Sequence, residues 1–361
     1  MNIRFVVPAL GLIALSATAA SAQEIAKGVT LDGYLDTIAT ATTNDSGTSN
    51  KTPSTTDFSA EAVIKVGWSL ADGKINSLVS TRTTNDQGSL ALAEAYASIK
   101  ATPEVTVSAG KSYGPFGYYS GYATGLTTIN YALTVNMYTV NPVGAWLAYA
   151  PNEKVTVTGI LADGFSGQNN FNPATTPSVN GAYKFNGAAY KASKAGTVSP
   201  GVDIVFNPSP ELSLNVEGYL DPSAGVDGAI YFGGFNIQFK KDAILAAGEV
   251  LYMVNEGGKD GKSDSSSLSW AAFVTYTLPA DAPFAGAVTG QLSQYSPSKT
   301  LTADSDTMTK VQLALLTNPL TISQFGLNYE LFYVMDDKNN NVANKSLDSY
   351  GVAIEGLFVI P

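Results

Sequence analysis

The feature that most constrains this chain is an apolar–polar alternation with a period of two residues, sustained over unusually long segments. The clearest example covers residues 58–70, where Phe58, Ala60, Ala62, Ile64, Val66, Trp68 and Leu70 alternate with Ser59, Glu61, Val63, Lys65, Gly67 and Ser69. Strands of soluble sandwiches usually run about 5–6 residues. A tilted strand that crosses a bilayer needs about 9–11 residues. The pattern therefore predicts membrane-crossing strands.

Other parts of the chain show the same apolar face. Its members are Leu212, Leu214, Val216 and Leu220, then Leu268, Trp270, Ala272, Val274, Tyr276 and Leu278, and finally Tyr350, Val352, Ile354, Phe358 and Ile360. After Ala22 no segment approaches the roughly 20 apolar residues of a membrane helix. Because hydrocarbon offers no partners to backbone N–H and C=O groups, only helices and closed barrels cross it. The chain therefore predicts a closed barrel.

The connections between the predicted strands are alternately short and long. Short turns lie near residues 71–73, 101–103, 151–153, 208–210, 240–241, 279–283 and 318–319, and long loops cover 41–57, 85–89, 113–141, 165–198, 221–228, 255–266, 297–306 and 336–347. Seven turns and eight loops join sixteen strands. The prediction is an all-β, transmembrane, antiparallel up-and-down β-barrel with short periplasmic turns and long extracellular loops. A strand within 127–140 would change the count to fourteen or eighteen.

The first 22 residues have the pattern of a cleaved export signal. Arg4 is followed by a short apolar run from Phe5 to Leu15, and Ala20-Ser21-Ala22 matches the small-residue cleavage pattern. We expect cleavage after Ala22 and a single barrel domain over 23–361. The alternative is an uncleaved anchor helix.

The composition excludes several classes of function. The 361 residues include no Cys and no His, and 20 basic residues stand against 30 acidic ones, a net charge of −10. Residues 110–114 match G-x-S-x-G, but a serine hydrolase triad requires a His. An acidic balance also argues against nucleic-acid binding. We predict that the protein is not an enzyme and has no cofactor.

Metal binding is not predicted either. Acidic residues cluster in polar loops, as Asp304 with Asp306 and as Asp336 with Asp337. Such groups are usually solvated loop tips, although weak Ca²⁺ binding through their oxygens is an alternative.

Residues 94–164 carry the most specific motifs. They are Glu94-Ala95-Tyr96, the segment GKSYGPFG from Gly110 to Gly117, Val143-Gly144-Ala145-Trp146, the turn PNEKV from Pro151 to Val155, and Asp163-Gly164. This stretch, about a fifth of the chain, resembles the OmpL-like β-barrel porin family.

The resemblance implies a Gram-negative outer-membrane porin that lets small polar solutes or ions diffuse passively through its lumen. Outer-membrane lipid would surround the barrel, and three copies would associate as a homotrimer. Two alternatives remain open. One is a structural or adhesive outer-membrane barrel with a plugged lumen, and the other is a soluble, secreted all-β carbohydrate-binding protein.

The alternation also predicts which charged side chains face the lumen. The candidates are Asp32, Asp36, Glu61, Lys65, Arg82, Glu217, Glu249, Lys310, Glu330 and Glu355. A Lys or Arg on the lipid face at mid-membrane costs about 2–4 kcal/mol, which favours the lumen. The excess of acids predicts a modest cation preference. If the charges pair and cancel, a weak anion preference or none is expected.

The loop 113–141 is the candidate constriction. The resemblance implies that this third long loop folds into the barrel, with bulk supplied by Tyr113, Phe116, Tyr118, Tyr119 and Tyr122. The alternatives are that it is an outward surface loop, or that the longer loop 165–198 is the lid.

Overall fold

The computed structural model describes most of the chain after the predicted signal segment. The described residues are 23–45, 55–84, 90–113, 116–118, 126–137, 142–164, 198–222, 229–255, 265–279, 282, 286–297, 307–317, 324–337 and 348–360. Residues 1–22, Tyr119, Tyr122, Asp304, Asp306 and all but the last residue of the loop 165–198 lie outside these ranges. The predictions made for them stay predictions.

The described chain consists almost entirely of strands. They are β1 (Gln23–Ala26), β2 (Val29–Asp45), β3 (Thr55–Leu70), β4 (Ile75–Thr84), β5 (Leu90–Lys100), β6 (Val105–Lys111), β7 (Val143–Asn152), β8 (Val155–Ala162), β9 (Ser199–Ser209), β10 (Leu212–Asp221), β11 (Ile230–Lys241), β12 (Ile244–Asn255), β13 (Ser265–Thr277), β14 (Gly286–Pro297), β15 (Thr307–Thr317), β16 (Phe325–Asp337) and β17 (Asp348–Ile360). One short 3₁₀ helix, η2 (Leu133–Met137), lies between β6 and β7.

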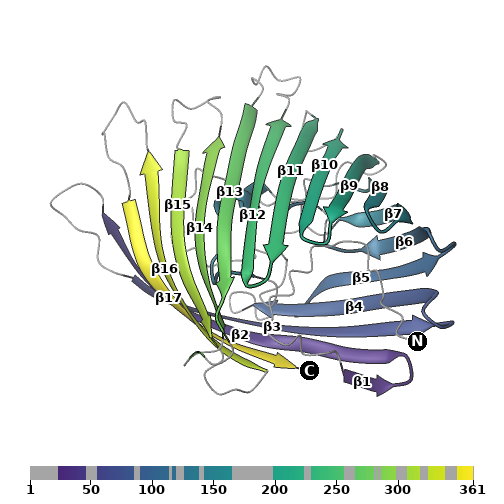
Figure 1. The fold of residues 1–361 in the computed structure, drawn as a ribbon, viewed down its shortest axis with the longest axis horizontal. Helices are drawn as coiled ribbons and strands as arrows, with labels where there is room; N and C mark the ends of the chain where they lie inside the picture. Colours follow the sequence, from purple (N-terminus) through teal and green to yellow (C-terminus); the bar gives the residue numbers. More distant parts are fainter. Residues whose placement is uncertain are drawn as a thin grey trace.

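The sheet closes on itself. Each strand from β2 to β17 pairs antiparallel with its neighbours in sequence, and β17 returns to pair with β2 from Ile360↔Gly33 to Asp348↔Asp45. Figure 1 shows β17, in yellow, beside β2, in purple. The short β1 folds back on β2 as a hairpin extension. The predicted sixteen-stranded antiparallel barrel is confirmed.

The turns explain the topology. On one rim the chain reverses within a few residues, as between Leu70 and Ile75, where Ala71, Asp72 and Gly73 all have positive φ angles of 51°, 55° and 84°. Such left-handed backbone suits tight hairpins. The longer connections join the strands on the other rim (Figure 1).

The segment 127–140 contains no strand in its described part. Residues 127–130 form bends and residues 133–137 form η2, so the alternative counts of fourteen and eighteen are wrong. The physical reason is closure. Since β6 is already paired with β5 and β7, no free sheet edge is left there for another strand.

The two faces of the barrel differ as the alternation predicts. On the outer face Leu313, Leu331 and Val352 are 52%, 56% and 44% exposed. Their neighbours in sequence point inward: Ala314, which follows Leu313, is 0% exposed, and Glu330, which precedes Leu331, is 2% exposed. Within the described ranges, no helical segment has the length and apolar character needed to span a membrane.

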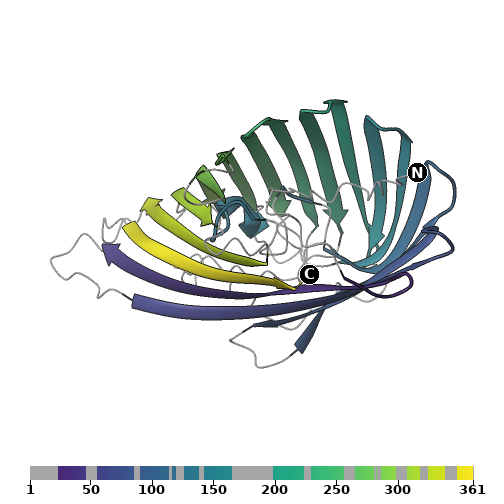
Figure 2. The ribbon, with the colours of Figure 1, turned by 60° about the horizontal axis from the view of Figure 1, so that its bottom comes forward.

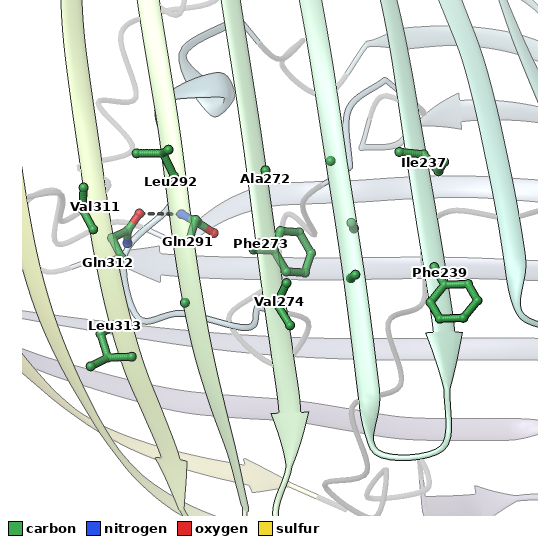
Figure 3. Close-up of a pocket in the computed structure, with 14 residues that line it drawn as sticks. Ile237, Phe239, Ala272, Phe273, Val274, Gln291, Leu292, Val311, Gln312 and Leu313 are labelled. Atoms are coloured by element: carbon green, nitrogen blue, oxygen red, sulfur yellow. Dashed lines mark hydrogen bonds between the residues drawn. The ribbon is translucent and has the colours of Figure 1, made fainter.

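A shallow apolar groove lies in the outer face across β11 to β15. Small residues there, Ala246, Gly248, Ala272 and Gly290, stand between larger apolar side chains. Figure 3 shows Val311, Leu313 and Leu292 at this surface, together with the Gln291–Gln312 hydrogen bond of 2.5 Å between side chains buried on the inner face. The groove therefore belongs to the outside of the wall and not to the lumen.

An outer face of this kind predicts contact with hydrocarbon at mid-height. Leu331 lies in the middle of β16, opposite Leu313 and Val352, whereas Ile244 begins β12 beside a short turn. We expect Leu331→Arg to lower the free energy of unfolding in lipid vesicles by about 2–4 kcal/mol, and the matched Ile244→Arg by about 0–1 kcal/mol. Urea titration measures both. Equal losses would contradict a membrane-embedded band.

Candidate functional site

The described parts of the loop between β6 and β7 lie inside the barrel. Figure 2 shows η2, in teal, within the ring of strands, and it packs against β12, β13, β14 and β15. Thr127, Asn130 and Thr134 are at most 1% exposed. A polar segment buried this deeply must find partners for its backbone groups.

The loop has no charge of its own, because residues 112–142 contain no Asp, Glu, Lys or Arg. Glutamates of the wall accept its amide protons instead. Glu94 on β5 accepts from the N–H of Tyr113 at 3.2 Å, and Glu217 on β10 accepts from that of Gly117 at 2.8 Å.

Two further wall glutamates hold the middle of the loop. Glu249 on β12 accepts from the N–H of Tyr118 at 3.1 Å. Glu330 on β16 accepts from the backbone N–H groups of Ile129 and Asn130 at 2.8 and 3.1 Å, and from the Asn130 side-chain amide at 2.7 Å. Hydrogen bonds to an ionised acceptor are roughly twice as strong as neutral ones. We call Glu94, Glu217, Glu249 and Glu330 the glutamate anchors.

Side chains on β14 and β15 complete the attachment. Lys310 donates to the carbonyl of Tyr131 at 3.0 Å, and Gln312 donates to the carbonyl of Asn130 at 2.7 Å. The N–H of Leu133 donates to the Ser293 hydroxyl at 3.1 Å. The wall thus offers acceptors to loop amides and donors to loop carbonyls.

Aromatic packing fixes the start of the loop against β10–β13. The ring of Phe116 lies 5.3 Å from that of Tyr219 and 5.9 Å from that of Phe232, and Tyr118 lies 5.0 Å from Phe273. These separations are favourable for tilted aromatic pairs. Burial also raises the pKa of Tyr118 well above its usual range, so its hydroxyl stays neutral.

On the opposite wall, Arg82 of β4 is the centre of a polar cluster. Its guanidinium contacts the Glu61 carboxylate twice, each time at 2.8 Å, and donates to the hydroxyls of Tyr113 at 3.0 Å and Tyr34 at 3.4 Å. Tyr34 also donates to Glu61. Through Tyr113 this cluster holds the first residues of the loop.

All ten charged residues predicted to face the lumen lie on the inner face of the described barrel. Besides those above, Lys65 forms an ion pair with Asp32 at 3.5 Å, and Asp36 and Glu355 are 6% and 4% exposed. Glu94 and Lys111 lie on strands with weak alternation, which does not predict the side that they face. Glu94 faces inward. Lys111 lies on the same side as the outward Val107 and donates to the Leu92 carbonyl at 2.6 Å.

The balance of buried charge is acidic. Among the described residues, the buried ionisable acids number eight and the bases two, namely Asp36, Glu94, Asp203, Glu217, Asp221, Glu249, Glu330 and Glu355 against Arg82 and Lys310. No group of three metal-binding side chains occurs in the same ranges.

Sequence reasoning missed several lumen residues. Gln312 and Asn328 are uncharged, and Asp203 lies on β9, which is not among the strands with the clearest alternation, yet each is buried on the inner face. Gln312 follows Lys310 by two residues, so the alternation places it correctly. Asn130 carried no such signal, because its role depends on the path of the loop.

Comparison with known proteins agrees with this architecture. No protein-family model matches the sequence, and no curated protein sequence does. The outer membrane channel DcaP of Acinetobacter baumannii is similar over 92% of this chain and 97% of its own, with a TM-score of 0.65 and 12% identity. An anion-selective porin from Comamonas acidovorans matches over 92% and 99%, with a TM-score of 0.63 and 12% identity.

A third solved structure, the trimer form of the outer membrane protein OmpT of Vibrio cholerae, covers 92% of this chain and 99% of its own, with a TM-score of 0.54 and 10% identity. At such low identities the similarity concerns the fold. The chain therefore has the barrel fold of outer-membrane porins, and the narrower resemblance to the OmpL-like family stays a prediction.

The glutamate anchors make a testable claim about the loop. Glu330→Gln removes a charged acceptor of three loop N–H groups, and a hydrogen bond to a charged group contributes about 1.5–3 kcal/mol. We expect amide exchange over residues 126–137 to rise roughly 10- to 100-fold, measured by hydrogen exchange with mass spectrometry. Asp203→Asn, which changes a buried wall acid of β9, is the control. Equal protection in both variants would contradict the anchoring.

Proposed function

We propose that this protein is an outer-membrane porin through which small polar solutes or ions diffuse passively. The observation that carries the proposal is a closed barrel whose outer face is apolar and whose inner face is charged. An apolar outside suits lipid, and a polar inside suits water. The soluble alternative fits this arrangement poorly, because the large exposed apolar side chains lie all around the ring.

The loop between β6 and β7 is the proposed constriction. Its described segments lie inside the ring and contact walls on several sides, from Glu94 on β5 to Glu330 on β16. A segment held across the lumen narrows it. Tyr113, Phe116 and Tyr118 would then limit the size of a passing solute, with Tyr119 and Tyr122 as further proposed members.

A modest cation preference follows from fixed charge. The loop is uncharged, so the wall sets the potential, and in the described part of the chain buried acids outnumber buried bases eight to two. Fixed charge of one sign raises the local concentration of the opposite ion. The porin from Comamonas acidovorans, which has a similar fold, is described as anion-selective. The sign of the wall charge supports the opposite preference here.

The remaining parts of the proposal concern location and assembly. Residues 1–22 would direct export and be removed after Ala22, which leaves 23–361 in the outer membrane, surrounded by lipid. The trimer form among barrels of similar fold supports a homotrimer. The sequence contains no His, so the proposed function does not include hydrolysis by a Ser-His-Asp triad.

A second candidate is a structural or adhesive barrel with a plugged lumen. The observation that favours it is the burial of the loop, since Thr127, Thr128 and Thr134 are 1%, 2% and 0% exposed. A segment packed this tightly leaves little room for water beside it.

Single-channel recording separates the two candidates. We expect the full chain, purified from outer membranes in detergent, to give stepwise conductance in planar bilayers, with a reversal potential in asymmetric KCl that favours K⁺. A folded, heat-modifiable barrel without conductance would support the plugged barrel. A reversal potential that favours Cl⁻ would be consistent with a porin but would contradict the proposed cation preference.

A further inference from the structure

Three carboxylates lie side by side on neighbouring strands of the inner wall. Asp36 on β2 is directly opposite Glu61 on β3. Glu355 on β17 lies diagonal to Asp36, because the register pairs Asp36 with Leu357 and Ile38 with Glu355. Like charges this close are unfavourable unless something neutralises them.

Only one of the three has a base. Glu61 is bonded twice to Arg82, which is also held by the Tyr113 and Tyr34 hydroxyls. A second ion pair joins Lys65 to Asp32, farther along β2. Asp36 lies within electrostatic range of Arg82, but the guanidinium contacts Glu61. The remaining carboxyl groups therefore form a pair without a bonded cation.

The pair is buried and incompletely bonded. Asp36 and Glu355 are 6% and 4% exposed, and their carboxyl groups are within hydrogen-bonding reach of each other. Asn328 donates to Glu355 at 2.5 Å. Within the part of the chain that the structure describes, Asp36 Oδ1 has no hydrogen-bond donor. The glutamate anchors, in contrast, accept loop amides. Asp203 Oδ1 and Glu217 Oε2, on residues paired across β9 and β10, also lack a donor in the described chain, but Glu217 holds the loop through the Gly117 amide. The Asp36–Glu355 pair therefore has unused acceptor capacity apart from the glutamate anchors.

We propose that Asp36 and Glu355 form a binding site for a small monovalent cation, K⁺ or Na⁺, on the wall of the lumen. The proposal rests on the proposed porin function, since the lumen is the route by which the ion arrives. The pair offers few oxygens, whereas Ca²⁺ takes 6–8. Water would complete the shell of a monovalent ion.

An approach to the site is visible along β2. Asp32 precedes Asp36 by four residues on the same face, a distance of roughly 13 Å along a strand. Its side chain is 34% exposed, whereas Asp36 is almost fully covered. Because Asp32 is already paired with Lys65, the uncompensated negative charge on this side of β2 lies at the buried pair, where it favours cations.

The first test measures binding without transport. We expect the folded full chain in detergent to unfold at a temperature a few degrees higher in KCl than in N-methyl-D-glucamine chloride of equal concentration, because an ion that binds only the native state stabilises it. Asp36→Asn combined with Glu355→Gln should abolish the difference. Asp32→Asn combined with Asp221→Asn removes the same number of wall carboxylates, from residues that already have partners in Lys65 and Ser199, and should preserve it.

An equal unfolding temperature of the unmodified chain in the two salts would overturn the site and indicate that the pair shares a proton instead. A salt-dependent shift that survives in the Asp36–Glu355 variant would also overturn it.

The second readout is the reversal potential of the same proteins. We expect the Asp36–Glu355 variant to lose cation preference severalfold relative to the Asp32–Asp221 control. If the variant conducts and its ion selectivity is unchanged, the cation site is overturned but the proposed porin function is not. A chain that never conducts would sink the porin function, and the unfolding measurement would then still decide whether the cation binds.

Discussion

The interior of this barrel depends on hydrogen bonds between wall carboxylates and loop amides. A closed sheet satisfies its own backbone, but a chain segment inside it brings unpaired N–H groups into a space with little water. Glu217, Glu249 and Glu330 supply the acceptors. Without them the amide groups of Gly117, Tyr118 and Ile129 would lose these acceptors inside the barrel. The position of the loop, and with it the free cross-section of the lumen, follows from these contacts.

The same contacts divide the wall acids into two groups. The glutamate anchors direct their charge into the loop backbone, where partial positive charge on the amide protons offsets it. Asp36 and Glu355 have no such partners and face each other between β2 and β17. A count of acidic residues therefore overstates the charge that an ion meets, and the location of each acid matters more than the total.

The barrel could be predicted well from the sequence, and the interior only in part. Strands and their two faces depend on local alternation, and the seven short turns and eight long loops determine the number of strands. Even an isolated buried base, Lys310, is placed correctly by its neighbours. The partners of the loop are different. Ile129 and Glu330 are 201 residues apart, and no local pattern links an uncharged loop to a particular carboxylate. Asn130 was missed for the same reason, whereas Gln312 was missed because it is uncharged, although the alternation places it on the inner face.

The absence of charge from residues 112–142 has a consequence for how this protein can change over evolutionary time. The anchors bind backbone N–H groups, and almost every residue type has one. Side chains other than the packed Phe116 and Tyr118 can therefore be exchanged, and the size and polarity of the opening adjusted, while the loop keeps its place. Proline is the exception, because it lacks the N–H that each anchor receives. At Ile129 the constraint is on the backbone. At Gly117 the positive φ of 94° also favours glycine, and at Asn130 the side-chain amide also donates to Glu330.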